Sequence, residues 1–259
     1  TAYGFGALDA ITGGDLNTVV GYLAGSAINS GSNNVLMGYA TGDALTTGGD
    51  NVAIGYAALS VEDTTGKATA IGYKALNAQN AAGDSYNVAV GYEAGASITT
   101  GDLNTLVGGD AGDALTEGNS NVAVGYNALT AETLGDRNVA IGFSALETQN
   151  NTSDLDAYNV AMGYEAGKSV TTGVKNTLIG GLAGDALTTG QQNVALGYNA
   201  LSSEDLGSRS TALGYNTLGA QNVDGNIYNV AVGYSAGGAI TEGTQNTLIG
   251  SLAGDSLNT

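Results

Sequence analysis

The sequence predicts an all-β fold, a β-solenoid (parallel β-roll) of about 15 coils with a 17-residue period. Fifteen copies of one short segment, each centred on a Gly, cover the 259 residues, and eleven of the fourteen spacings are 17 residues. The copy from Asn51 to Leu59 alternates its side chains as a strand does, and Gly, Asn, Asp and Thr, which favour turns, follow most copies. Helical repeats need about 33–47 residues, whereas 17 suffice for two short strands and two turns.

The positions around the repeated Gly recur as well. Asn lies four residues before it in twelve of fourteen copies, and Ala lies three residues after it in thirteen of fifteen. We interpret the Gly as a tight corner or a backbone with positive φ. This Gly recurs as Gly55, Gly125 and Gly197, among other positions. The Asn residues are expected to form a hydrogen-bonded ladder along stacked turns, with a row facing a ligand as the alternative. The row includes Asn51, Asn121 and Asn193.

The strand alternation assigns side chains to two faces. Val52 and Ile54 share one face, and we expect them to fill the interior of the roll. Ala53 and Gly55 lie on the other face, which is flat and rich in Ala. Because a flat apolar face is usually covered in solution, we expect this Ala face to pack against another copy of the chain.

A longer period of about 70 residues is superimposed on the coils. Four residues after the motif Gly the chain reads Leu, Leu, Gly, Gly in rotation, and the three longer spacings follow the second Leu copy. A basic residue lies five residues before the Gly of that copy, and Tyr occupies the same position one copy later. These residues are Lys67, Arg137, Arg209, Tyr86, Tyr158 and Tyr228. We predict that they contact a ligand or a second subunit through cation–π pairs, with a solvated edge as the alternative.

A row of aromatic residues follows the motif Gly, with Tyr in ten copies and Phe in two. Stacked rings would stabilise this corner of the coil or lie between subunits. The functional alternative is an aromatic platform for sugar rings, which requires exposed ring faces.

Composition excludes several kinds of chemistry. The chain has no Cys and no His, so Ser-His-Asp and Cys-His sites cannot form, and we expect no enzymatic activity. Its net charge of −18 opposes binding to nucleic acid, and no apolar run is long enough to insert into a membrane. The acidic pairs Glu62-Asp63 and Glu204-Asp205 are interpreted as solvated turns. We expect no cofactor, with incidental calcium at Gly-Asp turns left open.

At Asn51-Val52-Ala53-Ile54-Gly55 and its copies, the sequence resembles the YadA-like heads of trimeric autotransporter adhesins, whose motif is of the Asn-Ser-Val-Ala-Ile-Gly type. The resemblance covers the whole chain and implies a left-handed parallel β-roll in a homotrimer. This chain lacks the Ser of that motif, and its 17-residue coil is longer than the family's. Similar repeats occur in phage tail fibres and other fibrous surface proteins.

We therefore expect residues 1–259 to be one continuous solenoid domain within a longer chain or polymer. The expected function is a structural and adhesive fibre segment, extracellular, on a cell or virion surface. Its expected partners are copies of itself, as a trimer or an end-to-end polymer, and a host-surface glycan or matrix protein. An extracellular filament or surface-layer subunit is the main alternative. An ice-binding solenoid, suggested by Thr pairs, and a tail-spike glycan-processing enzyme are less favoured.

Overall fold

The computed structural model describes residues 1–64 and 66–258, and it is an all-β parallel solenoid of about 15 coils with about 17 residues per turn. The predicted fold class is confirmed, and the described residues contain no helix. By their internal contacts the coils form two units, Thr1–Val124 and Gly125–Thr259.

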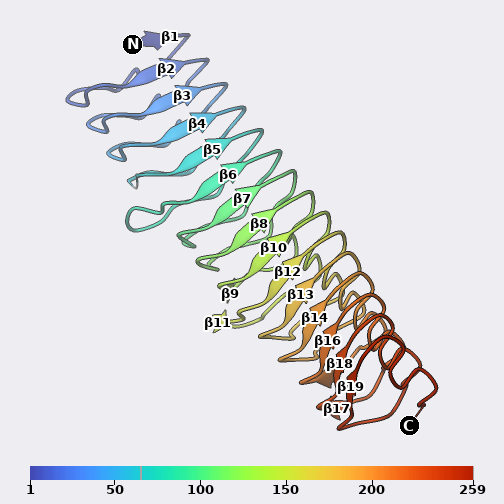
Figure 1. The fold of residues 1–259 in the computed structure, drawn as a ribbon. Helices are drawn as coiled ribbons and strands as arrows, with labels where there is room; N and C mark the ends of the chain where they lie inside the picture. The colour runs from blue at the N-terminus through green and yellow to red at the C-terminus, as the bar shows by residue number, and fades with distance from the viewer. Residues whose placement is uncertain (65, 259) are drawn as a thin grey trace. The chain divides into compact units, whose positions relative to one another are not determined.

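The first unit stacks one short strand per coil into a parallel sheet (Figure 1). Its strands are β1 (Ala2–Tyr3), β2 (Thr18–Val20), β3 (Val35–Met37), β4 (Val52–Ile54), β5 (Thr69–Ile71), β6 (Val88–Val90), β7 (Thr105–Val107) and β8 (Val122–Val124). Equivalent residues of successive copies are paired, as Ala53 is with Ala70. Residues at the same position of the repeat therefore form continuous rows along the unit.

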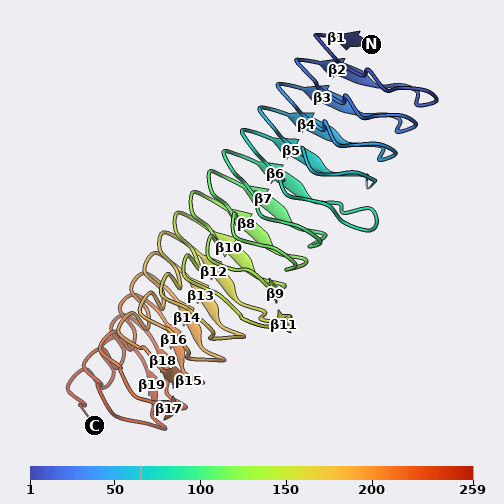
Figure 2. The same cartoon turned by 180° about the vertical axis from the view of Figure 1, so that it is seen from behind.

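The second unit repeats this arrangement and adds short strands in the loops that lead into the main sheet (Figure 2). Its main strands are β10 (Val139–Ile141), β12 (Val160–Met162), β13 (Thr177–Ile179), β14 (Val194–Leu196), β16 (Thr211–Leu213), β18 (Val230–Val232) and β19 (Thr247–Ile249). Two short parallel pairs flank them: β9 (Gly135–Asp136) with β11 (Leu155–Asp156), and β15 (Gly207–Ser208) with β17 (Gly225–Asn226).

The two faces of each strand are opposite to the prediction. Ala53 is fully buried, whereas Val52 and Ile54 are partly exposed on the outer face. Strand alternation places Val52 and Ile54 on one side and Ala53 on the other, without showing which side faces inward. Asn51 lies two residues before Ala53 and is buried, which is consistent with the inward direction of the Ala53 side. Val52 and Ile54 therefore do not fill the roll, and the Ala face is not available to another copy.

The small interior explains this reversal and the four-copy period. In the coil of Gly95, the strand contributes only Ala89 to the interior, and Leu side chains from both neighbouring coils occupy the space over Gly95. A Cβ on Gly95 would lie 2.7 Å from Leu106 Cδ1 and 3.1 Å from Leu76 Cδ2. At Gly112, the second Gly of the rotation, the nearest side-chain atoms belong to Leu115 and Leu106 of its own coil. The rotation of Leu and Gly is thus a packing pattern, in which Gly makes room for a Leu of its own coil or of an adjacent one.

The motif Gly residues form a close-packed backbone row. Gly55 has φ of 137°, and a Cβ built on it would lie 2.2 Å from the carbonyl oxygen of Gly72 in the next coil. Both the left-handed backbone and the backbone contact require Gly. The prediction of a positive-φ corner is confirmed at Gly55, Gly125 and Gly197.

Candidate functional site

The buried Asn residues bond successive coils together. The side-chain oxygen of Asn34 accepts from the backbone N–H of Asn51 at 3.0 Å, and its amide donates to the carbonyl of Gly48 at 3.0 Å. Asn51 accepts in the same way from Ala68 N–H at 3.0 Å. Because these groups lie within the coil and are bonded to the chain itself, this row has a structural role rather than a ligand-binding one.

The same bonds recur at the other two predicted Asn positions. The N–H of Asn121 donates to the side-chain oxygen of Asn104 at 2.9 Å. Asn193 accepts from the N–H of Ser210 at 2.9 Å and donates to the carbonyl of Gly207 at 2.9 Å.

The acidic residues predicted in solvated turns include fully buried ones, which is a correction. Glu62 and Glu204 have no exposed surface, and each lies at the position where Gly-type coils carry Ile, Leu or Val. In the next coil a buried Gln donates to each carboxylate: Gln79 Nε2 to Glu62 at 3.0 Å and Gln221 Nε2 to Glu204 at 2.8 Å. Sequence patterning missed them because each Glu precedes turn residues.

A third buried carboxylate shows what these residues do. One oxygen of Glu132 accepts from the backbone N–H groups of residues 133, 134 and 135 at 2.9–3.2 Å. It also accepts from the N–H of Asn151 at 3.0 Å, and Gln149 Nε2 donates to the other oxygen at 2.8 Å. The buried Glu and Gln thus hold the wider loops against the coil, since every bond is to the chain itself.

Burial perturbs one of these carboxylates. The pKa of Glu204 is raised because burial disfavours its charged form, and hydrogen bonds from Gln221, Gly207 and Val223 only partly oppose this effect. A raised carboxyl pKa is also a feature of catalytic acids. Glu204, however, faces the interior, and its oxygens are bonded to this chain.

The predicted basic and Tyr residues meet in pairs within one chain. Lys67 Nζ lies 5.0 Å from the ring centroid of Tyr86, donates to its hydroxyl at 3.0 Å and pairs with Asp84 at 2.5 Å. The pKa of Lys67 is raised, first by its hydrogen bond to Asp84. The Arg137 guanidinium lies 5.8 Å from the Tyr158 ring and pairs with Asp156.

The third pair, Arg209 with Tyr228, has no Asp at the position where the other two pairs have one. Arg209 lies 5.6 Å from the Tyr228 ring and donates to its hydroxyl at 2.9 Å, but Asn226 stands where the other two pairs have Asp. Arg209 instead donates to the side-chain oxygen of Gln192 at 2.8 Å. All three pairs lie at exposed loop edges, and a ligand or a second subunit there remains a prediction.

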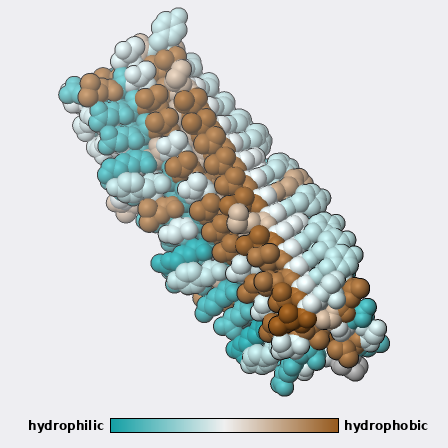
Figure 3. Space-filling view, viewed as in Figure 1, coloured by the Kyte–Doolittle hydropathy of each residue, from teal (hydrophilic) through white to brown (hydrophobic). Residues whose placement is uncertain are grey.

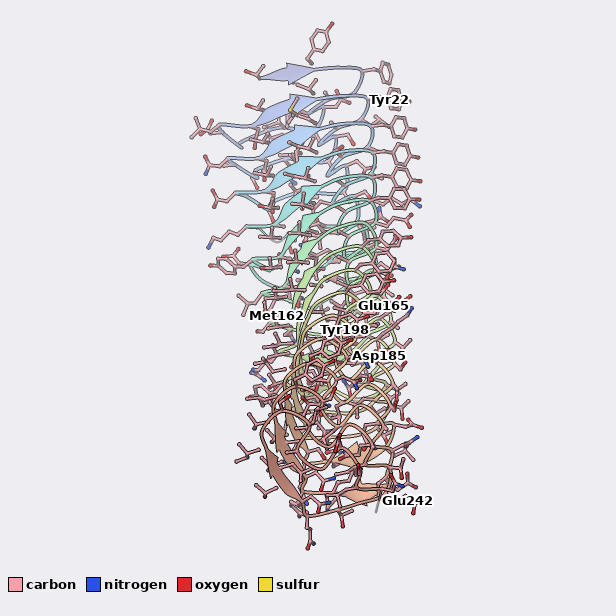
Figure 4. All side chains as sticks on the ribbon, turned by 45° about the vertical axis from the view of Figure 1, so that its right-hand side comes forward. Tyr22, Met162, Glu165, Asp185, Tyr198 and Glu242 are labelled. Carbon is pink, nitrogen blue, oxygen red and sulfur yellow. The ribbon has the colours of Figure 1, made fainter. Side chains whose placement is uncertain are left out.

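The aromatic row forms face-to-face stacks with centroids 5.1–5.7 Å apart. Figure 4 shows the rings of the first unit as a column that projects from the coils near Tyr22. Inside a stack each ring covers the faces of its neighbours, so the outer edges and hydroxyl groups face solvent. The platform for sugar rings needs open ring faces, and these occur only where a stack ends.

The outward strand residues form the most apolar surface. Figure 3 shows a hydrophobic stripe along the strands of each unit, and Met37, Val107, Met162 and Leu196 are exposed in it. Contiguous exposed apolar surface of this kind is typical of protein–protein contacts. The prediction that the Ala side chains pack against another copy is wrong, because they are buried, and the exposed apolar surface lies on the outer strand side chains instead.

The described residues show no enclosed pocket and no group of three or more acidic residues placed to hold a metal ion. In this part of the chain no helix is long and apolar enough to cross a membrane. The Thr pairs do not form an open array, because Thr46, Thr99 and Thr171 donate to carbonyl oxygens of the next coil.

Comparison of the chain with protein-family models, curated proteins and solved structures found no match.

Proposed function

We propose that this chain is a structural and adhesive segment of an extracellular surface fibre, assembled from copies of itself. The continuous apolar row on the outer face of the strands carries this proposal. In a single chain that row is exposed to water from coil to coil, although a parallel solenoid needs no such surface to fold.

A second copy of the chain is the partner that fits the row best. In each unit seven three-residue strands among the described residues present two outer side chains each, eleven of them apolar and three of them Thr, and stable interfaces use about 20–30 residues a side. Two copies also share the same distance between coils, so their rows can meet coil for coil. A partner without this repeat could contact only part of the row.

The resemblance to YadA-like heads favours a trimer and a place on a cell or virion surface. The net charge of −18 supports a solvated, repetitive surface rather than one that binds anionic partners. Adhesion would come from weak contacts repeated along the coils, with a host glycan or matrix protein as the partner.

Sedimentation and native mass measurements test the assembly. The double variant Val52→Lys and Ile54→Lys places two cations in the outer row and should shift the equilibrium toward the monomer. Glu117→Lys changes the net charge by the same amount at an exposed turn, and it should leave the mass unchanged. A monomeric wild type would exclude the oligomer, and polymers that lengthen with concentration would favour the filament alternative.

A glycan array and immobilised matrix proteins test adhesion separately. Replacing Tyr22 and Tyr56 by Ala removes two ring edges from the first unit and should weaken binding if the ring row is the contact. Binding that is unchanged by these substitutions would place adhesion elsewhere on the surface.

A further inference from the structure

The aromatic row of the second unit is interrupted by one missing ring. Tyr126, Phe143 and Tyr164 form one stack, and Tyr198, Tyr215 and Tyr234 form another. Gly181 occupies the position between the two stacks. The flanking rings of Tyr164 and Tyr198 are 57% and 52% exposed, against 44% for Phe143 and 49% for Tyr215 inside the stacks. Each flanking ring has a stacking neighbour on one side only, Phe143 for Tyr164 and Tyr215 for Tyr198.

The backbone does not require this gap. Gly181 lies outside the positive-φ region, unlike the motif Gly180 beside it. A Cβ on Gly181 would lie 3.4 Å from Tyr198 Cδ2, which is ordinary van der Waals contact. Tyr39 fills the same position in a coil of the same type in the first unit, where it stacks on Tyr22 and Tyr56. A ring could thus occupy position 181, and its absence leaves a notch.

The notch has the dimensions and charge of a cation site. Two coil steps separate the flanking rings by roughly 10 Å, so a planar group midway would lie about 5 Å from each ring, within cation–π range. Glu165 directly follows Tyr164 and pairs with Lys168 at 2.9 Å, and Glu147 lies 3.8 Å from the same Lys168. Asp185 is close enough to interact electrostatically with Glu165 and Lys168. Glu147 belongs to the coil of Phe143, one coil further away, so the rim of the notch itself consists of the carboxylates of Glu165 and Asp185 and the ammonium of Lys168, and it is negative.

We propose that the notch at Gly181 binds the guanidinium group of an arginine side chain carried by a partner protein. A planar cation can stack on both ring faces at once, and the acidic rim of Glu165 and Asp185 complements its charge. Because the notch is open rather than enclosed, it suits a side chain anchored in a larger surface.

This site does not depend on the proposed oligomer. Figure 4 shows Met162, from the outer strand row, and Glu165, beside the notch, on different sides of the coil. A partner arginine could therefore reach the notch while the strand row is covered.

Ligand-observed NMR with a short acetylated and amidated Gly-Arg-Gly peptide tests the proposal on the full chain. The same peptide with citrulline in place of arginine keeps the planar group but removes its charge. We expect binding of the arginine peptide to exceed that of the citrulline peptide by about ten-fold, since two cation–π contacts and the rim charge are lost. Gly181→Tyr, which fills the notch, should abolish the difference.

Two further variants keep the test informative if Gly181→Tyr perturbs the coil. Tyr39→Gly should create a second, weaker notch in the first unit, where Asp43 stands at the position of Asp185 but residue 23, the position of Glu165, is Leu. Glu165→Gln should weaken binding of the arginine peptide by about three-fold while leaving that of the citrulline peptide unchanged. Equal binding of both peptides, or no effect of Gly181→Tyr, would overturn the proposal. Binding of a neutral methyl glycoside that is lost in Gly181→Tyr would overturn it too and assign the notch to sugars.

Discussion

The two units share one interior but differ in their aromatic rows. The first unit carries an unbroken stack of six rings from Phe5 to Tyr92, whereas the second carries two stacks of three separated by Gly181. Inside, both units repeat the same row of bonded Asn and the same Leu and Gly packing. Interior positions are constrained by neighbouring coils on both sides, whereas a surface ring can be omitted without loss of the coil. Differences in the surface rows are thus where function can vary.

The largest effect should come from the backbone row that both units share. Gly55→Ala in the first unit and Gly197→Ala in the second each place a Cβ against a carbonyl oxygen and force a disfavoured φ. We expect the free energy of unfolding to fall by about 3–5 kcal/mol. Gly181→Ala is the matched control, because its Cβ meets only ordinary contacts, and it should change stability by less than about 0.5 kcal/mol. Equal denaturant midpoints for all three variants would contradict this account.

Replacing Tyr39 by Gly, or Gly181 by Tyr, should make the aromatic row of one unit resemble that of the other. Tyr39→Gly breaks the stack of the first unit and should lower its stability by about 1–3 kcal/mol, since two ring contacts are lost. Gly181→Tyr joins the stacks of the second unit and should raise its stability by about 1–2 kcal/mol. Hydrogen exchange of peptides from each unit measures the two effects separately. Changes of the same sign in both variants would show that the stacks do not stabilise the coils.

The buried Glu204 should make the second unit sensitive to pH. Because its folded pKa is raised above 4.5, the folded chain binds more protons than the unfolded chain between 4.5 and the raised value. The stability that protonated Glu204 contributes is present below pH 4.5, and it is lost as the pH rises through the pKa of Glu204 in the folded chain. The free energy of unfolding should therefore fall more steeply with pH in the wild type than in Glu204→Gln. Parallel pH curves from chemical denaturation would contradict the prediction.

The smallest effect should come from the exposed Arg209 and Tyr228 pair. Asn226→Asp restores the acid found in the other two pairs and should raise the unfolding temperature by about 1–2 °C at low salt. The gain should disappear at high salt, because an exposed ion pair is screened. A gain that persists in salt would indicate a packing effect instead. Asp156→Asn is the reverse change and should lower the temperature by a similar amount.

Much of the fold could be predicted because every copy of the repeat keeps the same residue types at the same few positions relative to its Gly. The spacing of the motif Gly predicted the coil, and the recurrence of Asn four residues earlier marked the row that the structure shows bonded from coil to coil. The equal offsets of Lys67 and Tyr86 from successive Gly residues marked both positions, but the structure adds that they contact each other within one chain. The buried Glu62 could not be recognised, because its partner Gln79 lies one coil away and a charged residue before a turn normally faces water.

The sequence by itself determined the period, the coil count and the rows, because identical offsets must stack when coils are in register. Only the tertiary structure decided which side of each row faces inward. Strand alternation is symmetric between the two faces, and the choice depends on how much volume a 17-residue coil can enclose. That volume admits Ala53 and Leu59 of the same coil and leaves Val52 and Ile54 partly exposed on the outside. The notch at Gly181 likewise depends on rings that meet only when the coils stack.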